Sequence, residues 1–138
     1  MNHEDSEFLR SFEACEIPNA GFHHRDHIRL ACLYVQRYGP GASERICESI
    51  RAFAAAHGKS DKYHQTVTIA WMELVQQAVR SSPPDARFED IVARFPALLD
   101  KNHLGEFYSE QILISQMAKQ IFVPPDRKPL VLAQMVSN

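Results

Sequence analysis

The sequence predicts an all-α protein, a single-domain irregular bundle of five or six helices around one core. Apolar residues recur at three- and four-residue spacing along most of the chain, and glycine and proline interrupt that pattern at intervals. No segment keeps the alternating pattern that is typical of a strand. A chain of 138 residues is long enough for one core and too short for two. We therefore expect one helical domain over residues 1–138, with residues 127–138 as a largely irregular C-terminal tail.

The first half of the chain predicts three helices, each with a recognisable beginning or end. Asp5 or Ser6 is the expected N-cap of the first helix. Gly39-Pro40 is a typical end for the second helix, and Gly58 is the expected left-handed cap of the third. In chain order these helices cover residues 5–15, 24–38 and 43–57.

The second half predicts a long helix, a short one and a final one. The long helix spans residues 63–80, where a 3.6-residue period outweighs the low helix propensity of a β-branched run near its start. The short helix begins near Phe88 and ends or kinks at Pro96. In residues 97–108 the sequence suggests a helical turn around Leu98, Leu99 and Leu104. Ser109 is the expected N-cap of a last helix, whose apolar face consists of Ile112, Leu113, Met117 and Ile121.

Composition favours a cytoplasmic protein and argues against two classes of partner. The net charge of −2 provides no basic surface for nucleic acid or anionic lipid, and no apolar run reaches the roughly 20 residues needed to span a bilayer. The N-terminus is polar and acidic, unlike a secretory signal. Cys15, Cys32 and Cys47 form no C-x-x-C pair, so we expect reduced core thiols. We expect no nucleic acid and no membrane among its partners.

Three histidines stand within five residues at the predicted start of the second helix. On a helical wheel, His24 and His27 fall on the apolar face that Ile28 continues, and His23 lies to one side, within reach of His27. At the start of the fourth helix, His64 also continues an apolar stripe. The rings of His24, His27 and His64 are therefore expected to point inward.

Inward-facing imidazoles need partners, and a divalent metal can take one nitrogen from each ring. We therefore predict a mononuclear site in which His24, His27 and His64 bind a divalent metal ion between two helix N-termini. The sequence does not distinguish Zn, Fe, Ni and Mn. Such a centre can activate water or polarise a substrate oxygen, which suggests a metal-assisted enzyme that acts on a small molecule. Residues expected to line the pocket or to hydrogen-bond the ligands are His23, Tyr63, Gln65, Thr66, Thr68, Trp71 and Tyr108.

The sequence leaves several alternatives open. A histidine near a helix start often caps the helix, so the rings can be structural and the chain a non-enzymatic helical interaction module. In that case the apolar tail from Pro129 docks on a partner or on a second copy, giving a homo-oligomer. A third alternative is a metal-free pocket that binds a small-molecule ligand or performs acid–base chemistry. His57 is expected to interact with a helix dipole, and His103 is a candidate fourth ligand.

The chain also resembles a family of small uncharacterised bacterial proteins over about residues 8–130. The resemblance rests on an aromatic-x-His-x-x-His helix start, a Tyr-His-x-Thr helix start, and later Tyr-Ser and Pro-Asp segments. It implies that these segments belong together, but it implies no activity. The family often has an acidic residue where this chain has Gln65, which puts a carboxylate base at that position in doubt. At the level of architecture the chain is also similar to helical bundles that hold a three-histidine metal site. The matching residues are Phe22, His24 and His27; Tyr63, His64 and Thr66; Tyr108 and Ser109; and Pro125 and Asp126.

Overall fold

The structure, a computed structural model, describes residues 2–132 and confirms the all-α prediction. Those residues form seven α-helices and five short 3-10 helices, and no strand occurs among them. The chain divides into two compact units, Met1–Tyr63 and His64–Asn138, where the sequence predicts a single domain. Each unit is described by itself below. The last six residues of the predicted tail, 133–138, lie outside the described part of the chain.

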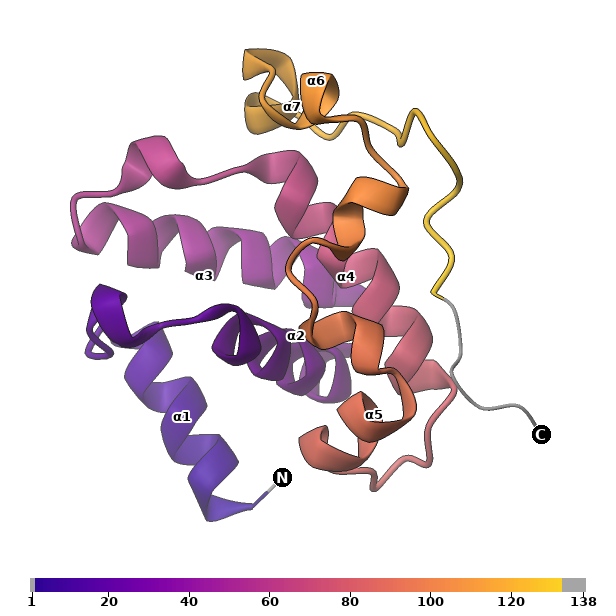
Figure 1. The fold of residues 1–138 in the computed structure, drawn as a ribbon. Coiled ribbons are helices and arrows are strands. Elements are labelled where there is room, and N and C mark those ends of the chain that lie inside the picture. The colour runs from indigo at the N-terminus through magenta and orange to yellow at the C-terminus, as the bar shows by residue number, and fades with distance from the viewer. Residues whose placement is uncertain (1, 133–138) are drawn as a thin grey trace. The chain divides into compact units, whose positions relative to one another are not determined.

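The first unit contains three longer helices, α1, α2 and α3 (Figure 1). Helix α2 packs against α3, and α1 packs against both. Their apolar stripes meet in a core where Leu9, Phe12, Leu30 and Ile46 are at most 2% exposed. The three helices span His3–Glu13, His24–Tyr38 and Ala42–Ala56, and the 3-10 turns of this unit span Asn19–Gly21, Gly39–Gly41 and Ser60–Lys62.

A buried tyrosine connects all three helices of the first unit. The Tyr34 hydroxyl on α2 lies 2.6 Å from the Glu13 carboxylate on α1 and 2.7 Å from the Ser49 hydroxyl on α3. A phenol has one proton, so Tyr34 donates to Glu13 and accepts from Ser49. Burial, followed by the bond to Glu13, raises the pKa of Tyr34, and the phenol therefore stays neutral.

Helix α1 begins two residues earlier than predicted. Its N-cap is Asn2, whose side-chain oxygen accepts a hydrogen bond of 2.8 Å from the Asp5 backbone N–H. Asp5 and Ser6, the predicted caps, lie inside the helix, where Asp5 pairs with Arg29 of α2 at 2.9 Å. Asn is as good an N-cap as Asp or Ser, so composition alone could not select among the three positions.

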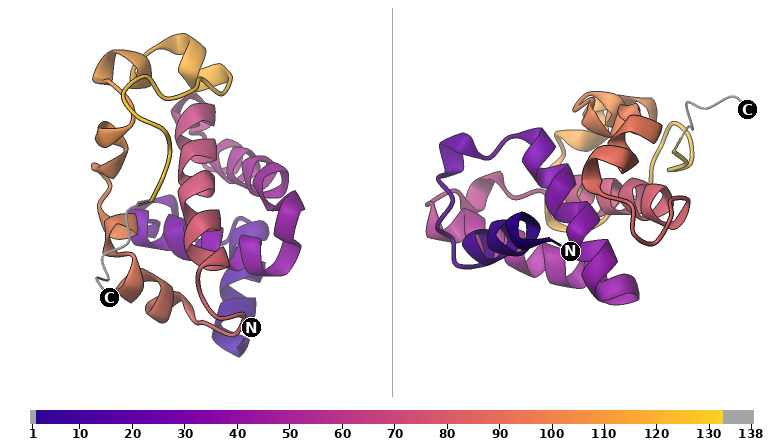
Figure 2. Two further views of the ribbon diagram at one scale, coloured as in Figure 1. Left: turned by 90° about the vertical axis from the view of Figure 1, so that its right-hand side faces the viewer. Right: turned by 90° about the horizontal axis from the view of Figure 1, so that it is seen from below.

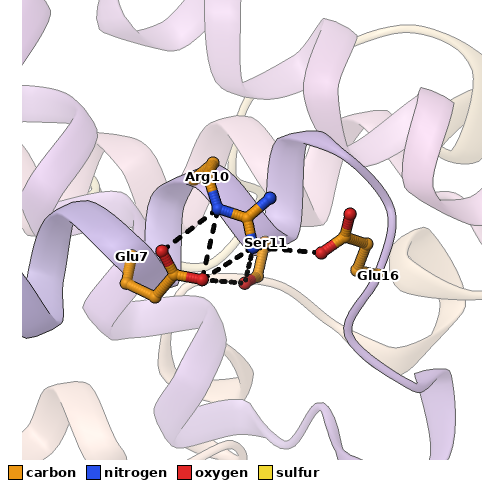
Figure 3. Close-up of polar contacts among 4 residues, drawn as sticks. All are labelled: Glu7, Arg10, Ser11 and Glu16. Atoms are coloured by element: carbon orange, nitrogen blue, oxygen red, sulfur yellow. Dashed lines mark hydrogen bonds and ion pairs between the residues drawn. The ribbon is translucent and has the colours of Figure 1, made fainter.

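A polar cluster covers the exposed side of α1 (Figure 3). The Arg10 guanidinium lies between the carboxylates of Glu7, at 2.6 Å, and Glu16, at 3.0 Å, and also reaches Ser11. The Arg10 bond holds the pKa of Glu7 below its usual value. All these groups are exposed to solvent or close to it, so the cluster fixes the direction of α1's surface side chains and adds little stability.

Helices α1 and α3 end in the same backbone motif with different residues in its left-handed position. After α3, Gly58 has φ +68° and its N–H bonds to Ala55, as predicted for a glycine cap. After α1, Cys15 takes the same place with φ +60° and bonds to Phe12. A side chain in this conformation costs roughly 1–2 kcal/mol. The backbone is therefore relaxed at Gly58 and strained at Cys15, so the two helix ends can be compared directly.

We expect Cys15→Gly to raise the free energy of unfolding by about 0.5–1 kcal/mol and Gly58→Ala to lower it by about 1 kcal/mol. No heavy atom lies within 4 Å of a Cβ added at Gly58, so the second change is purely conformational. Urea denaturation of both variants tests the pair. A loss of stability in Cys15→Gly would show that the thiol contact to the Ala52 carbonyl, at 3.9 Å, outweighs the backbone strain.

The second unit is organised along α4, Gln65–Arg80. One face of α4 is fully buried at Ala70, Leu74 and Ala78, each 0% exposed. Helix α7 and the second 3-10 turn of this unit pack against α4, and Figure 2 shows α6 and α7 near its N-terminal end. The remaining elements are α5 (Phe88–Arg94), α6 (Glu110–Leu113), α7 (Gln116–Gln120) and 3-10 turns at Pro96–Leu99 and His103–Glu106.

The predicted last helix is in fact two short helices, and that prediction is corrected. Ser109 is the N-cap of α6 as predicted, but α6 ends at Leu113. Ser115 then caps α7, with its hydroxyl accepting from the Ala118 N–H at 3.1 Å and donating to the Ile112 carbonyl at 2.7 Å. A serine that bonds the backbone in this way competes with helix continuation. The chain consequently turns at Ile114.

Candidate functional site

His64 is the N-cap of α4, and both of its ring nitrogens are engaged within the second unit. Its Nδ1 accepts the Val67 backbone N–H at 3.1 Å, which satisfies one of the free amides at the start of α4. Its Nε2 lies 2.7 Å from the carbonyl oxygen of Leu113, the last residue of α6. Because Nδ1 is an acceptor, Nε2 must carry the proton and donate to Leu113. The geometry therefore determines one neutral tautomer.

Thr66 connects the first turn of α4 to the residues that follow α7. Its hydroxyl donates to the Ile121 carbonyl at 2.8 Å and accepts the Val123 N–H at 3.0 Å. The residue is 0% exposed, so neither bond competes with water at the threonine. His64 and Thr66 thus hold the two ends of the α6–α7 pair, one at Leu113 and the other at Ile121. The Tyr-His-x-Thr segment therefore attaches the α6–α7 pair to the start of α4.

The α6–α7 pair carries an exposed group of large apolar side chains. Ile114 is 77% exposed, Met117 64%, Ile121 55% and Phe122 38%. We call these four residues the α6–α7 apolar surface. Single exposed apolar residues are ordinary, but four within nine positions make this segment the candidate interaction surface. The sequence predicts Met117 and Ile121 on the apolar face of a last helix, and the break at Ile114 leaves both largely in solvent.

His24 and His27 belong to the first unit, at the start of α2, with His23 as its N-cap residue. The His23 backbone N–H donates to the Asp26 carboxylate at 2.9 Å, which is half of a capping box. The His27 ring stands edge-on to Phe22, with centroids 4.4 Å apart. His27 is exposed, so the prediction that its ring points inward is wrong. Desolvation by neighbouring protein atoms, followed by the charge of His24, lowers the pKa of His27, and this exposure limits the effect.

The other predicted pocket residues are distributed over both units. Tyr63 closes the first unit, where the Arg51 guanidinium lies 5.1 Å from its ring centre. Gln65 and Trp71 are half-buried on α4. The Thr68 hydroxyl donates to the His64 carbonyl at 2.8 Å, a bond within the same helix turn. The Tyr108 hydroxyl donates to the Val123 carbonyl at 2.7 Å, beside the Thr66 contact.

His103 is buried and oriented by a carboxylate. Its Nδ1 lies 3.0 Å from Glu106, which also pairs with Lys128 at 3.0 Å, and its ring stands edge-on to Phe107. Its Nε2 is buried and has no hydrogen-bond partner among the described residues, and the same holds for Nε2 of His57. Among residues 2–132, no group of three or more His, Cys, Asp or Glu side chains gathers in a way that could hold a metal ion.

The first unit has a shallow depression of about 420 Å³ beside α1. Glu7 on its rim is already paired with Arg10, and Arg29 is paired with Asp5 and lies over the Phe8 ring at 4.2 Å. Because these charges are paired, the depression supports a function less well than the α6–α7 apolar surface. It is lined by His3, Glu4, Glu7, Phe8, Ser11, Ile17 and Arg29.

Comparison with known protein families, with curated proteins and with solved structures finds no match for this chain. The resemblance to a family of small bacterial proteins therefore stays a prediction. Two of the segments that it grouped do meet in the second unit, where the Ser109 backbone N–H donates to the Asp126 carboxylate at 2.8 Å. No helix in the described part of the chain is long and apolar enough to cross a membrane.

Proposed function

We propose that the chain is a non-enzymatic interaction module that presents the α6–α7 apolar surface to a second protein chain. The observation that carries this proposal is the exposure of Ile114, between α6 and α7, and of Met117 on α7, at 77% and 64%, in a helix pair whose two ends are anchored to α4. His64 and Thr66 act as structural residues that fix the two ends of the pair to α4. A preorganised apolar surface of this kind loses little conformational entropy on binding.

The charge distribution favours a second copy of the chain as the partner. No charged side chain occurs from Gln111 to Ala118, so Ile114 and Met117 are flanked by uncharged glutamines and a serine, and Lys119 is the one charged residue from Ile114 to Phe122. A two-fold symmetric interface brings identical patches face to face, where like charges would repel each other. The uncharged part of the surface around Ile114 and Met117 avoids that repulsion, so it can pair with itself.

We expect the protein to self-associate reversibly and Ile114→Lys combined with Met117→Lys to weaken the association at least about 100-fold. Each lysine replaces an apolar contact with a charge that a symmetric interface would desolvate and place near its copy. Sedimentation velocity over a range of protein concentrations measures the effect. Ala93→Lys, at an exposed position of α5, is the matched control and should associate like the unmodified chain.

Two outcomes would contradict this proposal. One is a chain that remains monomeric up to millimolar concentration. The other is an association that the double lysine variant leaves unchanged while circular dichroism shows unchanged helix content.

A second proposal retains the divalent metal centre of His24, His27 and His64. It is supported by the placement of His24 and His27 at the start of α2, three residues apart and therefore neighbours on the helix surface. This centre would draw on both units, and His64 would have to give up either the Val67 or the Leu113 hydrogen bond to offer a lone pair. The two proposals thus make opposite predictions for the His64 ring in the presence of metal.

A further inference from the structure

The Gln77 side chain on α4 holds the C-terminal segment by its backbone. Its Nε2 donates to the Leu130 carbonyl at 2.7 Å, and its Oε1 accepts the Leu132 backbone N–H at 2.8 Å. The amide group thereby pairs with the backbone on both sides of Val131, as a neighbouring β-strand would. Contacts of this type recognise an extended peptide largely independently of its side chains.

The side chains of the same segment alternate in burial. Leu132 is 8% exposed and Leu130 is half-buried, whereas Val131 between them is 64% exposed. Burial therefore alternates along the segment, in which the Val131 N–H also donates to the Pro129 carbonyl at 2.8 Å, a γ-turn centred on Leu130. The segment therefore binds through two apolar side chains, Leu130 and Leu132, and through the backbone hydrogen bonds to Gln77. Figure 2 shows it running alongside α4.

The attachment of the segment becomes weaker along the chain. Before it, the Arg127 N–H donates to the Phe107 carbonyl at 2.9 Å, and Asp126 is fixed by Ser109. Lys128 pairs with Glu106, but both side chains are 53% exposed, so this ion pair adds little. Beyond Lys128, the hydrogen bonds that tie the described backbone to the rest of the unit are the two from Gln77. Leu130–Leu132 can therefore detach without unfolding what precedes them.

We propose that Gln77 and the α4 surface around it form a docking site for an apolar-x-apolar segment, which the chain fills with its own Leu130–Leu132 and which the same segment of a second copy can occupy in exchange. A second copy necessarily carries the matching sequence. The tethered segment competes at an effective concentration in the millimolar range, so exchange becomes visible when the tethered segment is weakened. This inference does not depend on the α6–α7 apolar surface.

A fluorescein-labelled peptide of residues 127–134, capped at both ends, tests the inference in full-length protein by fluorescence anisotropy. The unmodified chain should bind it weakly because its own segment occupies the site. Leu132→Asp should vacate the site, since it places a carboxylate where a leucine is 8% exposed. We expect this variant to bind the peptide at least ten times more tightly than the unmodified chain does.

Three further variants separate docking from general effects. Val131→Asp adds the same charge at a solvent-facing position and should bind the peptide as the unmodified chain does. Leu132→Asp combined with Gln77→Leu should lose the gained affinity, because the backbone contacts are gone. Leu132→Ala, a milder change, should show the same trend as Leu132→Asp if the aspartate variant folds poorly.

The inference fails if Leu132→Asp and Leu132→Ala bind the peptide no better than Val131→Asp does. It also fails if the Gln77→Leu change leaves the gained affinity intact. The double lysine variant of the α6–α7 apolar surface should bind the peptide like the unmodified chain. A failure of this inference is therefore distinguishable from a failure of the proposed function.

Discussion

Thr66→Val should lower the free energy of unfolding by about 2 kcal/mol, although valine has nearly the same shape as threonine. The hydroxyl is fully buried and makes two hydrogen bonds, one to the Ile121 carbonyl and one from the Val123 N–H. Valine fills the space but leaves both backbone groups without this partner, and an unsatisfied buried polar group costs about 1–3 kcal/mol. Partial hydration of the exposed Ile121 end keeps the expected loss near the middle of that range.

Chemical denaturation provides the measurement, and Thr68→Val provides the control. Thr68 lies on the same helix, and its hydroxyl only bonds back to the His64 carbonyl one turn earlier. We expect that variant to lose less than about 0.5 kcal/mol, since such a bond adds little to a helix. Equal losses for the two variants would mean that the Thr66 contacts to the end of α7 are not what stabilises the protein.

Replacing His64 should reveal two separable contributions. His64→Ala removes the cap of α4, worth about 1 kcal/mol, and the bond to Leu113, worth about as much again. His64→Asn should recover the cap, because an asparagine oxygen can accept the Val67 N–H, but it is too short to reach α6. We therefore expect losses of about 2 kcal/mol for alanine and about 1 kcal/mol for asparagine.

The same variants link stability to the proposed function. Without the Leu113 bond, the end of α6 loses its attachment to α4, so self-association through the α6–α7 apolar surface should weaken in both variants. Denaturant unfolding gives the stabilities and sedimentation gives the association. If His64→Asn is as stable as the unmodified protein, the Leu113 bond contributes nothing to stability. If His64→Asn is as unstable as His64→Ala, the cap of α4 contributes nothing to stability.

Signals that act over a few residues predicted most of the fold. The bounds of α2 agree with the structure because an apolar 3.6-residue period meets Gly39-Pro40 at its end. Gly58 was predicted as a left-handed cap because glycine is the residue that most readily adopts a positive φ directly after a helix. Helix α5 ends before Pro96 for a similar local reason, since the proline restricts the residue that precedes it.

The candidate site was harder to predict because its contacts are distant in sequence. A helical wheel can show that His64 extends an apolar stripe, but the wheel cannot distinguish a cap from a metal ligand. That distinction depends on Leu113, 49 residues further along the chain. The exposure of Met117 was missed because an apolar period indicates a helix face and says nothing about what covers that face.

The most direct test of the structural role of His64 is the protonation state of its ring. Long-range nitrogen–proton correlation spectroscopy, at a pH where the ring is neutral, distinguishes the two tautomers. If His64 is a structural cap, the proton is on Nε2, Nδ1 is bare, and stoichiometric zinc leaves both nitrogen signals unchanged. A proton on Nδ1, or a zinc-dependent shift of the His64 nitrogens, would contradict the structural role and favour the three-histidine metal centre.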